Sequence, residues 1–464
     1  MMTRKIDEVA EIFRGIIGPE WVITERVYME SYLRDETPDV SRPPAAENLI
    51  LLKPSSTGEV SEILKAANEM RIPVFPVGGR TGLVGGCIPT EDGIILSLER
   101  MNRIDVDEEN LMATAEAGAT LADLIGAADE AGLFFPLHPG DEGAQIGGLI
   151  STNAGGVRAV KYGVMRNYVK GLEVVLATGD VLNLGGPLIK NNMGYDLMDL
   201  IIGSEGTLCV ITRAVIKLYP KSGCSVTLIL PYDDRSDAIR TVPSILRSGV
   251  IPLAIEYVEI KELNKAAEHI GDEWPVQSGK AQLIIILSGR SEDEVYSACE
   301  VISEVAEENN AGEPIIAETR DEQERILRIR SNIYTALKAE MVDILDITVP
   351  MSRLGDLMNS IDETSRKYGV YLPVYGHAGD GNLHIHLMKE GGEVPENIGE
   401  VKREIYDAGV RLGGVITGEH GIGHLRIGEL DRFISDKELS LMREIKRIFD
   451  PNNILNPGKI FPRG

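Results

Sequence analysis

Residues 77–86 read VGGRTGLVGG, so half of the residues in this stretch are glycine. A β-α-β pattern leads into it: ENLILLKP (47–54) is typical of a buried strand, Val60, Ile63 and Leu64 mark one face of a helix, and IPVFP (72–76) predicts another strand. Glycine lets backbone N–H groups come close to an anion, and successive N–H groups can form a concave phosphate site. Taken alone, the loop is also compatible with tight turns in a β-rich domain.

Two more glycine-rich segments follow, PGDEGAQIGGLISTNAGG (139–156) and IGSEGTLCVIT (202–212). Between them and the first loop, Thr120 and Asp123 are spaced to cap a helix. The chain contains neither the GxGxxG fingerprint nor the GxxxxGK[ST] phosphate loop. Three glycine-rich segments in one region therefore predict a long cofactor lying along them.

The pattern of the sequence changes after residue 220. Three strand–helix–strand units follow: SVTLIL, a helix near 235–248 and LAIEYVE; AQLIIIL, a helix near 291–309 and EPIIAE; DILDITVP, a helix near 352–367 and GVYLPVYG. Such units pack helices on one face of a mainly antiparallel sheet. We expect a first domain over residues 1–220 that begins with a helix within 1–20, a second domain over 221–430, and a C-terminal segment over 431–464.

Composition narrows the classes of function. A chain of 464 residues is too long for one hydrophobic core, and its net charge of −25 disfavours nucleic acid and anionic membranes as partners. The four cysteines form no CxxC pair, so they are typical of reduced thiols and cannot hold an iron–sulfur cluster. The N-terminus is not typical of a signal peptide, and no apolar run is long enough to span a bilayer. We therefore expect a cytoplasmic protein.

Five of the seven histidines fall between residues 377 and 424. His384 and His386 are two apart, so on a strand they face the same way, and His377 precedes a Gly-Asp-Gly turn that can fold it back toward them. With Glu419, two histidines suit a catalytic zinc site, and manganese or iron accepts the same ligands. Spacing alone favours the other interpretation, a polar pocket of hydrogen-bonded histidines.

Six motifs carry a resemblance to a known family: VGGRTGLVGG, IGGLISTNAGG, GYDLMDLIIGSEGTL, GHAGDGNLH, GEHGIG and NPGKIF. Over about residues 45–462 the chain resembles the FAD-dependent D-2-hydroxyacid dehydrogenases, which include D-lactate dehydrogenases, D-2-hydroxyglutarate dehydrogenases and the catalytic subunit of glycolate oxidase. These are flavoproteins of the vanillyl-alcohol oxidase type. The resemblance implies an α+β fold of two domains. The FAD-binding domain is joined by the C-terminal segment, and an α+β cap domain with a mainly antiparallel sheet covers the flavin.

The resemblance also implies where FAD binds. It assigns to the cofactor Val77, Gly78, Gly79, Arg80, Thr81, Gly82, Pro139, Gly148, Thr152, Asn153, Gly155, Gly156, Glu205, Ile211 and Asn456. Covalent attachment in more distant relatives uses a histidine or a cysteine. Cys87 adjoins the first loop here, but the relatives most like this chain bind FAD without a covalent bond, and we expect the same.

By the same likeness, His377, His384 and Glu419 are the ligands of a divalent metal, with zinc in first place. The resemblance implies that His420 is the base, that Arg330 binds the substrate carboxylate, and that His386 faces the substrate. A straight strand would turn Glu419 and His420 apart, but a turn between Gly418 and Gly421 can bring both to one site. In the implied reaction His420 takes the proton of a hydroxyl group whose pKa the metal lowers, and the Cα hydride passes to flavin N5.

The arginine assignment has two nearby competitors, Arg325 and Arg328, and a surface position on an amphipathic helix is the alternative for Arg330. His424 is expected to lie outside the ligand set. The hydroxyglutarate branch holds the distal carboxylate of its substrate with a lysine, and here that position falls on Ile344. We therefore expect oxidation of D-lactate to the 2-oxo acid, with glycolate as a weaker candidate, unless Lys338 supplies the missing cation.

Several alternatives stay open at this point. Relatives pass electrons to quinone or to an acceptor protein, which can be a separate iron–sulfur subunit, and a homo-oligomer is also compatible with the sequence. Within the family, D-2-hydroxyglutarate dehydrogenase is the alternative function. Outside it, the chain could be a metal enzyme without redox chemistry, or a non-catalytic flavin-binding subunit of a glycolate oxidase type complex.

Overall fold

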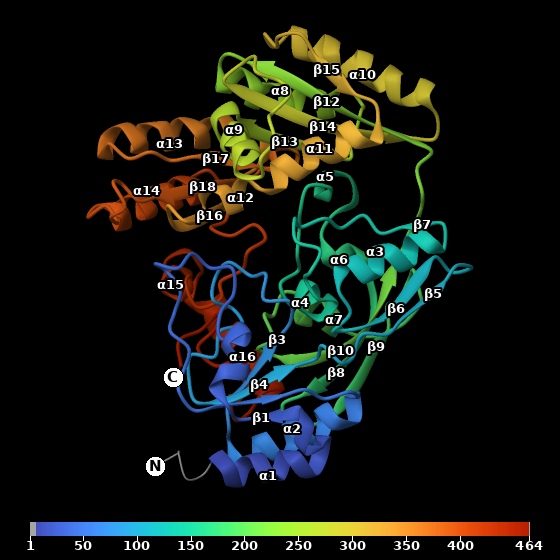
Figure 1. Ribbon diagram of the computed structural model, residues 1–464, viewed down its shortest axis with the longest axis vertical. Helices are drawn as coiled ribbons and strands as arrows, with labels where there is room; N and C mark the ends of the chain where they lie inside the picture. Colours follow the sequence, from blue (N-terminus) through green and yellow to red (C-terminus); the bar gives the residue numbers. More distant parts are fainter. Residues whose placement is uncertain (1–5, 464) are drawn as a thin grey trace.

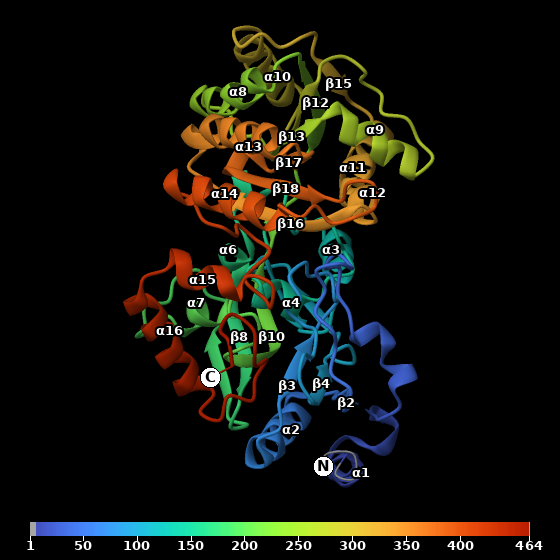
Figure 2. The same cartoon turned by 90° about the vertical axis from the view of Figure 1, so that its left-hand side faces the viewer.

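The structure is a computed structural model that describes residues 6–463. Two units stack along the longest axis, and the C-terminal helices return to the side of the lower one (Figures 1 and 2). The helices of the lower unit are α1 (Ile6–Ile17), α2 (Thr57–Met70), α3 (Leu121–Glu130), α4 (Ile146–Ser151), α5 (Ala159–Tyr162), α6 (Met165–Tyr168) and α7 (Leu197–Ile201). The predicted N-terminal helix is present as α1, and residues 1–5 of that prediction lie outside the described residues.

Two sheets form the framework of the lower unit. The first has the order β1 (Val22–Ile23), β2 (Leu49–Leu52), β4 (Gly93–Ser97) and β3 (Val74–Val77); the second has the order β5 (Ile104–Asp107), β6 (Met112–Glu116), β10 (Cys209–Lys217), β8 (Val169–Leu176) and β9 (Val181–Gly185). A small pair, β7 (Leu133–Phe134) with β11 (Tyr219–Pro220), lies apart. Strands β2, β4 and β3 are parallel, which explains why LILL of β2 is buried throughout. The first glycine-rich loop leaves the end of β3, so the β-α-β prediction is confirmed.

Side-chain caps fix the helix starts that the sequence predicted. Ser56 accepts the backbone N–H of Glu59 at the start of α2. Thr120 and Asp123 form the predicted capping box of α3. Caps of this kind supply partners for N–H groups that the first helical turn leaves free, and each contributes about 1 kcal/mol.

The upper unit contains one seven-stranded antiparallel sheet. Its order is β15 (Ile315–Ala317), β12 (Cys224–Tyr232), β14 (Ala281–Gly289), β13 (Ala254–Glu259), β17 (Val374–Gly376), β18 (Asn382–Met388) and β16 (Met341–Thr348). The helices α8 (Arg235–Arg247), α10 (Glu292–Glu307), α13 (Leu354–Tyr368) and α14 (Ile398–Arg411) bury their apolar sides in one core. The predicted α+β cap with an antiparallel sheet is therefore confirmed.

One detail of that prediction is wrong, because helices cover both faces of the sheet and not one. The helices α9 (Ile260–His269), α11 (Arg320–Ser331) and α12 (Ile333–Lys338) form a second core with strand residues of the opposite face. Leu263 of α9, Ile329 of α11 and Leu337 of α12 are buried there, next to Tyr375 and Ile344 of the sheet. This second face is also the one that carries the histidines.

The C-terminal segment packs against the lower unit. After α15 (Ile427–Phe433) and α16 (Asp436–Phe449), Ile454 and Leu455 enter the core of that unit. Val74 of β3 donates its N–H to the carbonyl of Ile454 at 2.7 Å, and its carbonyl accepts the N–H of Asn456 at 2.8 Å. The two main cores thus separate near residue 220, where the sequence places the boundary, and the limits 1–220, 221–430 and 431–464 stay a prediction. No helix within residues 6–463 is both long and apolar enough to cross a membrane.

Candidate active site between the two units

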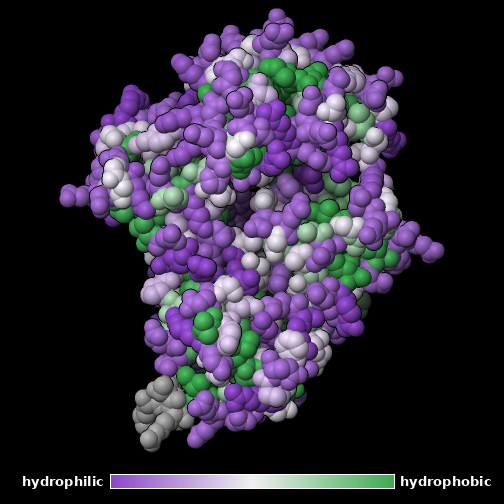
Figure 3. Space-filling model, in the orientation of Figure 1, coloured by the Kyte–Doolittle hydropathy of each residue, from purple (hydrophilic) through white to green (hydrophobic). Residues whose placement is uncertain are grey.

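A cavity lies where the glycine-rich segments meet. The space-filling view shows a hollow between the two units on this face (Figure 3). Of the residues that the resemblance assigns to FAD, the wall contains Val77, Gly78, Gly79, Arg80, Thr81, Gly82, Pro139, Gly148, Thr152, Gly155, Glu205, Ile211 and Asn456. The cavity continues to Glu419 and His420, so it joins the cofactor loops to the histidine cluster.

Asn153 and Gly156 lie just outside this wall. The side chain of Asn153 turns away, since its Oδ1 accepts the backbone N–H of Arg166 at 3.0 Å. Gly156 has φ +133°, and a Cβ there would come within 2.2 Å of the carbonyl oxygen of His138. Both positions shape the segment and do not face the cavity. The sequence did not single out Gln145, Ser151 and Val210, which also line it.

The first loop offers backbone hydrogen-bond donors that suit a phosphate group. Within residues 6–463, the backbone N–H groups of Gly79, Arg80 and Thr81 have no hydrogen-bond acceptor, although these residues line the cavity. A Cβ on Gly79 would come within 2.4 Å of the carbonyl oxygen of Gly143, so only glycine permits this close packing. Gly148 lies beside Gly78 of this loop, and a Cβ on Gly148 would meet open space. The residues present therefore fit a long cofactor that brings its own acceptor oxygens.

Glu205 ties the cavity to the loop that follows Glu419. Its two carboxylate oxygens accept the backbone N–H groups of Ile422 at 2.8 Å and Gly423 at 2.7 Å. Burial raises the pKa of Glu205 in spite of these hydrogen bonds. The side-chain amide of Asn456 donates to the backbone carbonyl of Glu205 at 2.8 Å and to that of Gly86 at 3.0 Å. Glu205 and Asn456 thus position the cavity wall through the backbone.

Cys87 also lines the cavity, but its thiol is poorly suited to attack a flavin. Burial raises the pKa of Cys87 far above the ordinary thiol value, and the charge of Asp35 adds to the effect. Because the thiolate is the nucleophile, a thiol with a raised pKa is inert near neutral pH. This supports the expectation of a cofactor held without a covalent bond.

Three histidines surround one oxygen of Glu419. The Nε2 atoms of His377 and His384 both lie 3.3 Å from Oε1 of Glu419, and Nε2 of His420 lies 3.9 Å away. Tetrahedral zinc with bonds of roughly 2.0–2.1 Å separates its ligand atoms by about 3.3–3.4 Å. The distances from Glu419 to His377 and to His384 both match this separation, and the bend at 418–421 does bring Glu419 and His420 to one site.

The second ring nitrogen of each of these two histidines faces a carboxylate, as is usual for metal-binding imidazoles. Nδ1 of His377 lies 2.7 Å from Oε1 of Glu256, and Nδ1 of His384 lies 3.6 Å from Oδ1 of Asp346. Burial lowers the pKa of His384, which favours the neutral ligand form. Burial acts the same way on His377, but the charges of Glu256 and Glu419 outweigh it and raise the pKa of that ring.

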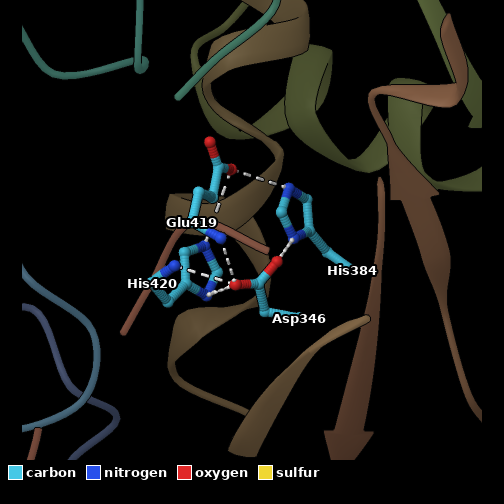
Figure 4. A group of neighbouring side chains, drawn as sticks. All are labelled: Asp346, His384, Glu419 and His420. Carbon is cyan, nitrogen blue, oxygen red and sulfur yellow. Dashed lines mark hydrogen bonds and ion pairs between the residues drawn. The ribbon is translucent and has the colours of Figure 1, made fainter. Parts of the chain in front are cut away.

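Asp346, His384, Glu419 and His420 form the tightest group of ligand-type side chains, and Asp346 lies between the two imidazoles on the side away from Glu419 (Figure 4). Its Oδ2 already accepts the backbone N–H groups of Gly418, Glu419 and His420 at 2.8–2.9 Å and the hydroxyl of Thr417 at 3.0 Å. Its Oδ1 accepts the amide of Asn382 at 2.7 Å. These donors occupy the lone pairs that a metal would need, so Asp346 anchors the loop and is not a ligand.

Arg330 is buried beside the same cluster. Its guanidinium forms an ion pair with Glu256 and lies 4.9 Å from the ring centre of Tyr375, while its Nε has no hydrogen-bond partner among the described residues. The competitors Arg325 and Arg328 pair with Asp272, away from the cluster. Arg330 is thus the arginine that the fold brings to the site.

His386 shares its face of β18 with His384 and stacks on Tyr375 at 4.7 Å. Burial lowers the pKa of His386 to about 3, so the ring is neutral, and its Nε2 has no partner within residues 6–463. His424 points to the C-terminal segment, where its Nδ1 lies 3.2 Å from the carbonyl oxygen of Gly458. His424 therefore lies outside the ligand set, as the sequence predicted.

Sequence reasoning missed Asp346 and Glu256. Both are carboxylates in strands whose other residues are almost all apolar, VDILDIT and AIEYVE. Burying a carboxylate is energetically unfavourable unless it has a partner, so an acid within an apolar strand was the sequence feature that could have identified these two residues.

Comparison with known proteins places the chain in a family. A family model described as FAD linked oxidases, C-terminal domain, matches residues 224–460, and one described as FAD binding domain matches residues 49–185. The D-lactate dehydrogenase of Archaeoglobus fulgidus is 44% identical over 432 residues, which are 93% of this chain and 95% of that protein. The chain belongs to the FAD-linked oxidases. The cavity and the histidine cluster lie where the two matched regions of this FAD-linked oxidase meet.

Glycolate oxidase subunit GlcD of Bacillus subtilis is 37% identical, and the match covers 98% of this chain and 97% of that protein. Among solved structures, p-cresol methylhydroxylase with substrate bound superposes with a TM-score of 0.79 at 18% identity, covering 99% of this chain and 98% of the other. The FAD-linked oxidase thus has the two-domain α+β fold of the vanillyl-alcohol oxidase type.

Proposed function

We propose that this FAD-linked oxidase converts a small D-2-hydroxy acid, D-lactate in first place, into the 2-oxo acid. One observation carries the proposal: the cavity lined by the glycine-rich segments ends at Glu419 and His420, which belong to the histidine cluster. A flavin cavity and a Lewis-acid site that share a wall suit the oxidation of an alcohol next to a carboxylate. The names of the relatives, a D-lactate dehydrogenase and a glycolate oxidase subunit, support the same substrate class.

The chain's own residues divide the work. The backbone donors of residues 79–81 would hold the phosphates of FAD, and His377, His384 and Glu419 would hold a divalent metal, zinc in first place. When bound, FAD accepts two electrons with the hydrogen from Cα, and the metal makes the α-hydroxyl more acidic. The side chains described at the site supply neither an electron acceptor nor a Lewis acid of their own.

Arg330 and His420 act on opposite ends of the substrate. We assign Arg330 to the substrate carboxylate because the ion pair with Glu256 holds its guanidinium beside the histidine cluster, and a guanidinium can bind a carboxylate with two hydrogen bonds. His420 is only slightly exposed, its ring stacks on His384 at 5.0 Å, and its Nδ1 has no hydrogen-bond partner among the described residues. A neutral imidazole beside the hydroxyl can take its proton near pH 7. His386, with its free Nε2, is the further polar contact that we assign to the substrate.

We infer the size of the substrate from the apolar residues near the histidine cluster. Ile344 is buried opposite His386 in the sheet, and Leu83 of the first glycine-rich loop packs against the same apolar cluster. Lys338, the cation that could receive a second carboxylate, is ion-paired with Glu36. A methyl group suits these surroundings better than a charged chain, which supports D-lactate over D-2-hydroxyglutarate.

The test is a visible spectrum before and after D-lactate is added without air. A yellow protein that bleaches supports the proposal, and chromatography of the released flavin should give FAD and not FMN. A colourless protein with bound metal would instead support a metal enzyme without redox chemistry. A yellow protein that no hydroxy acid bleaches would support a non-catalytic flavin subunit.

The route of the electrons is a separate part of the proposal. All four cysteines are free thiols scattered over the chain, so we infer that an iron–sulfur centre, if one is used, belongs to another protein. The likeness to a glycolate oxidase subunit supports an acceptor protein or a quinone in that role. We also predict that the protein is cytoplasmic and that it can form a homo-oligomer.

A further inference from the structure

We propose that Glu256 is a positioning residue that couples metal binding to substrate binding, because one carboxylate orients both His377 and Arg330. The inference rests on the proposed function, since it concerns the same metal site and the same substrate carboxylate. It assigns a role to a residue outside the ligand set and outside the groups that touch the reacting atoms.

The two oxygens of Glu256 have different partners. Glu256 lies on β13 with only 1% of its surface exposed. Its Oε1 lies 2.7 Å from Nδ1 of His377, and its Oε2 forms the ion pair with Arg330. Because Nε2 of His377 faces Glu419, Glu256 stands behind the imidazole and cannot reach a metal at that atom.

A hydrogen bond at Nδ1 fixes the tautomer and the orientation of a metal-binding imidazole and makes its other nitrogen a stronger ligand. Glu256 supplies this interaction to His377. Without it, the ring could rotate, or its proton could move to Nε2, where the metal would bind. Metal affinity should therefore depend on Glu256.

The same carboxylate keeps Arg330 in place. The ion pair joins Oε2 of Glu256 to Nη2 of Arg330, and Nε of Arg330 is buried without a hydrogen-bond partner among the described residues. Arg330 is 9% exposed, so it has little freedom to find another anion in solvent. Glu256 thus fixes the position from which Arg330 would bind the substrate carboxylate, while Tyr375 supports the guanidinium face at 4.9 Å.

Asp346 stands behind His384 in a comparable way, but the two carboxylates differ in what else they hold. Asp346 accepts four donors from residues 417–420 at one oxygen, so its loss would also release the loop. The polar partners of Glu256 are the side chains of His377 and Arg330. Replacement of Glu256 should therefore report on these two contacts with little change elsewhere.

The experiment compares Glu256→Gln with Glu259→Gln in the FAD-loaded protein. Glu259 lies on the same strand and pairs with Arg235 at 2.9 Å, so its replacement breaks a similar ion pair away from the site. Metal-depleted protein is titrated with zinc against a chromogenic chelator. KM and kcat for D-lactate are then measured with a dye acceptor.

For Glu256→Gln we expect zinc affinity to fall roughly 10–100-fold, the usual effect of losing such a partner, together with a raised KM. Glu259→Gln should stay within about twofold of wild type in zinc affinity, because it does not touch His377. If Glu256→Gln does not fold, Glu256→Asp replaces it. The shorter side chain cannot reach both His377 and Arg330, so we expect either the lower zinc affinity or the raised KM, but not both.

Wild-type zinc affinity together with wild-type KM in the Glu256 variant would overturn the inference and leave the proposed function intact. A wild-type protein that binds no zinc would overturn the metal part of the proposed function, and the inference with it. The two failures are thus distinguishable in the same titration.

Discussion

Oδ2 of Asp346 accepts the backbone N–H of Glu419 at 2.8 Å, so the carboxylate beneath the loop fixes the residue that the histidines surround. The adjacent N–H groups of Gly418 and His420 donate to the same oxygen at 2.9 and 2.8 Å. Burial opposes ionisation of Asp346, but its interactions with the imidazoles of His420 and His384 and with the backbone N–H of His420 outweigh it, and the pKa of Asp346 is lowered. A charged anchor therefore sets the geometry of the candidate metal site.

Asp346→Asn should loosen this loop. The amide oxygen of asparagine accepts the hydrogen bonds of the loop without a charge, which weakens them, and its amide nitrogen cannot accept the bond that Oδ1 takes from Asn382. We expect zinc affinity to fall by about tenfold, less than in His384→Ala, which removes a ligand outright. Metal content after gel filtration measures both. Asp407→Asn, on the exposed side of α14, is the control. Full metal content in Asp346→Asn would show that the loop holds its shape without the charge.

His420→Ala should retain FAD but slow its reduction by D-lactate roughly 10²–10⁴-fold, the usual effect of losing a general base. Stopped-flow absorbance under nitrogen follows the step directly. His424→Ala removes a histidine that faces Gly458 and serves as the matched control. If the His420 variant reduces flavin at the wild-type rate, the proton goes to another group.

Gly148→Ala tests whether the cavity holds FAD. No atom lies within 4 Å of the position its Cβ would take, so the new methyl group meets open cavity and not protein. We expect the apoprotein to keep its thermal midpoint while the Kd for FAD rises. Gly126→Ala, on the exposed side of α3 with nothing within 4 Å, should leave FAD binding unchanged and stabilise the helix by about 0.5–1 kcal/mol. Equal FAD affinity in both variants would place the cofactor elsewhere.

Asp343→Asn should change how stability depends on pH. Burial raises the pKa of Asp343, but Arg426 and Lys402 outweigh this and lower it below the unfolded value of roughly 3.9. The ion pair therefore stabilises the fold above about pH 4, and the contribution is lost as the pH falls through the folded-state pKa. Urea midpoints should differ most between wild type and variant at pH 7, and the difference should shrink as the pH falls below about 4. A constant difference over this range would contradict the assignment.

Asp343 and Asp346 also show how far the sequence could lead. The apolar pattern of VDILDITVP predicted a buried strand, and β16 is one. The two acids are three apart, so they leave opposite faces of the strand. One meets Arg426 at 2.7 Å, and the other meets the loop 417–420. A strand pattern shows that such acids are buried, but their partners are distant in the chain and only the fold brings them together.

Similar limits apply to the site as a whole. Glycine spacing predicted a cofactor region because turns and close backbone contacts are local properties. The ligand set depended on the family resemblance, because His377 and Glu419 are 42 positions apart and meet only through the bend at Gly418 and Gly421. The sequence indicated an amphipathic helix around Arg330, but it did not show that α9, α11 and α12 cover a second face of the sheet, because their burial is decided by the sheet they cover.

The last prediction concerns the substrate. Lys338, the one cation considered as a replacement for the missing lysine, is ion-paired with Glu36, and Tyr334 donates to the backbone carbonyl of Glu36. Ile344, at the position of the missing lysine, is buried in an apolar cluster and offers no partner to a second carboxylate. We therefore expect kcat/KM with a dye acceptor to be highest for D-lactate, lower for glycolate and D-2-hydroxybutyrate, and lowest for D-2-hydroxyglutarate and L-lactate. Lys338→Met should leave the D-lactate value unchanged. A preference for D-2-hydroxyglutarate that disappears in Lys338→Met would instead show that Lys338 exchanges Glu36 for the distal carboxylate of the substrate.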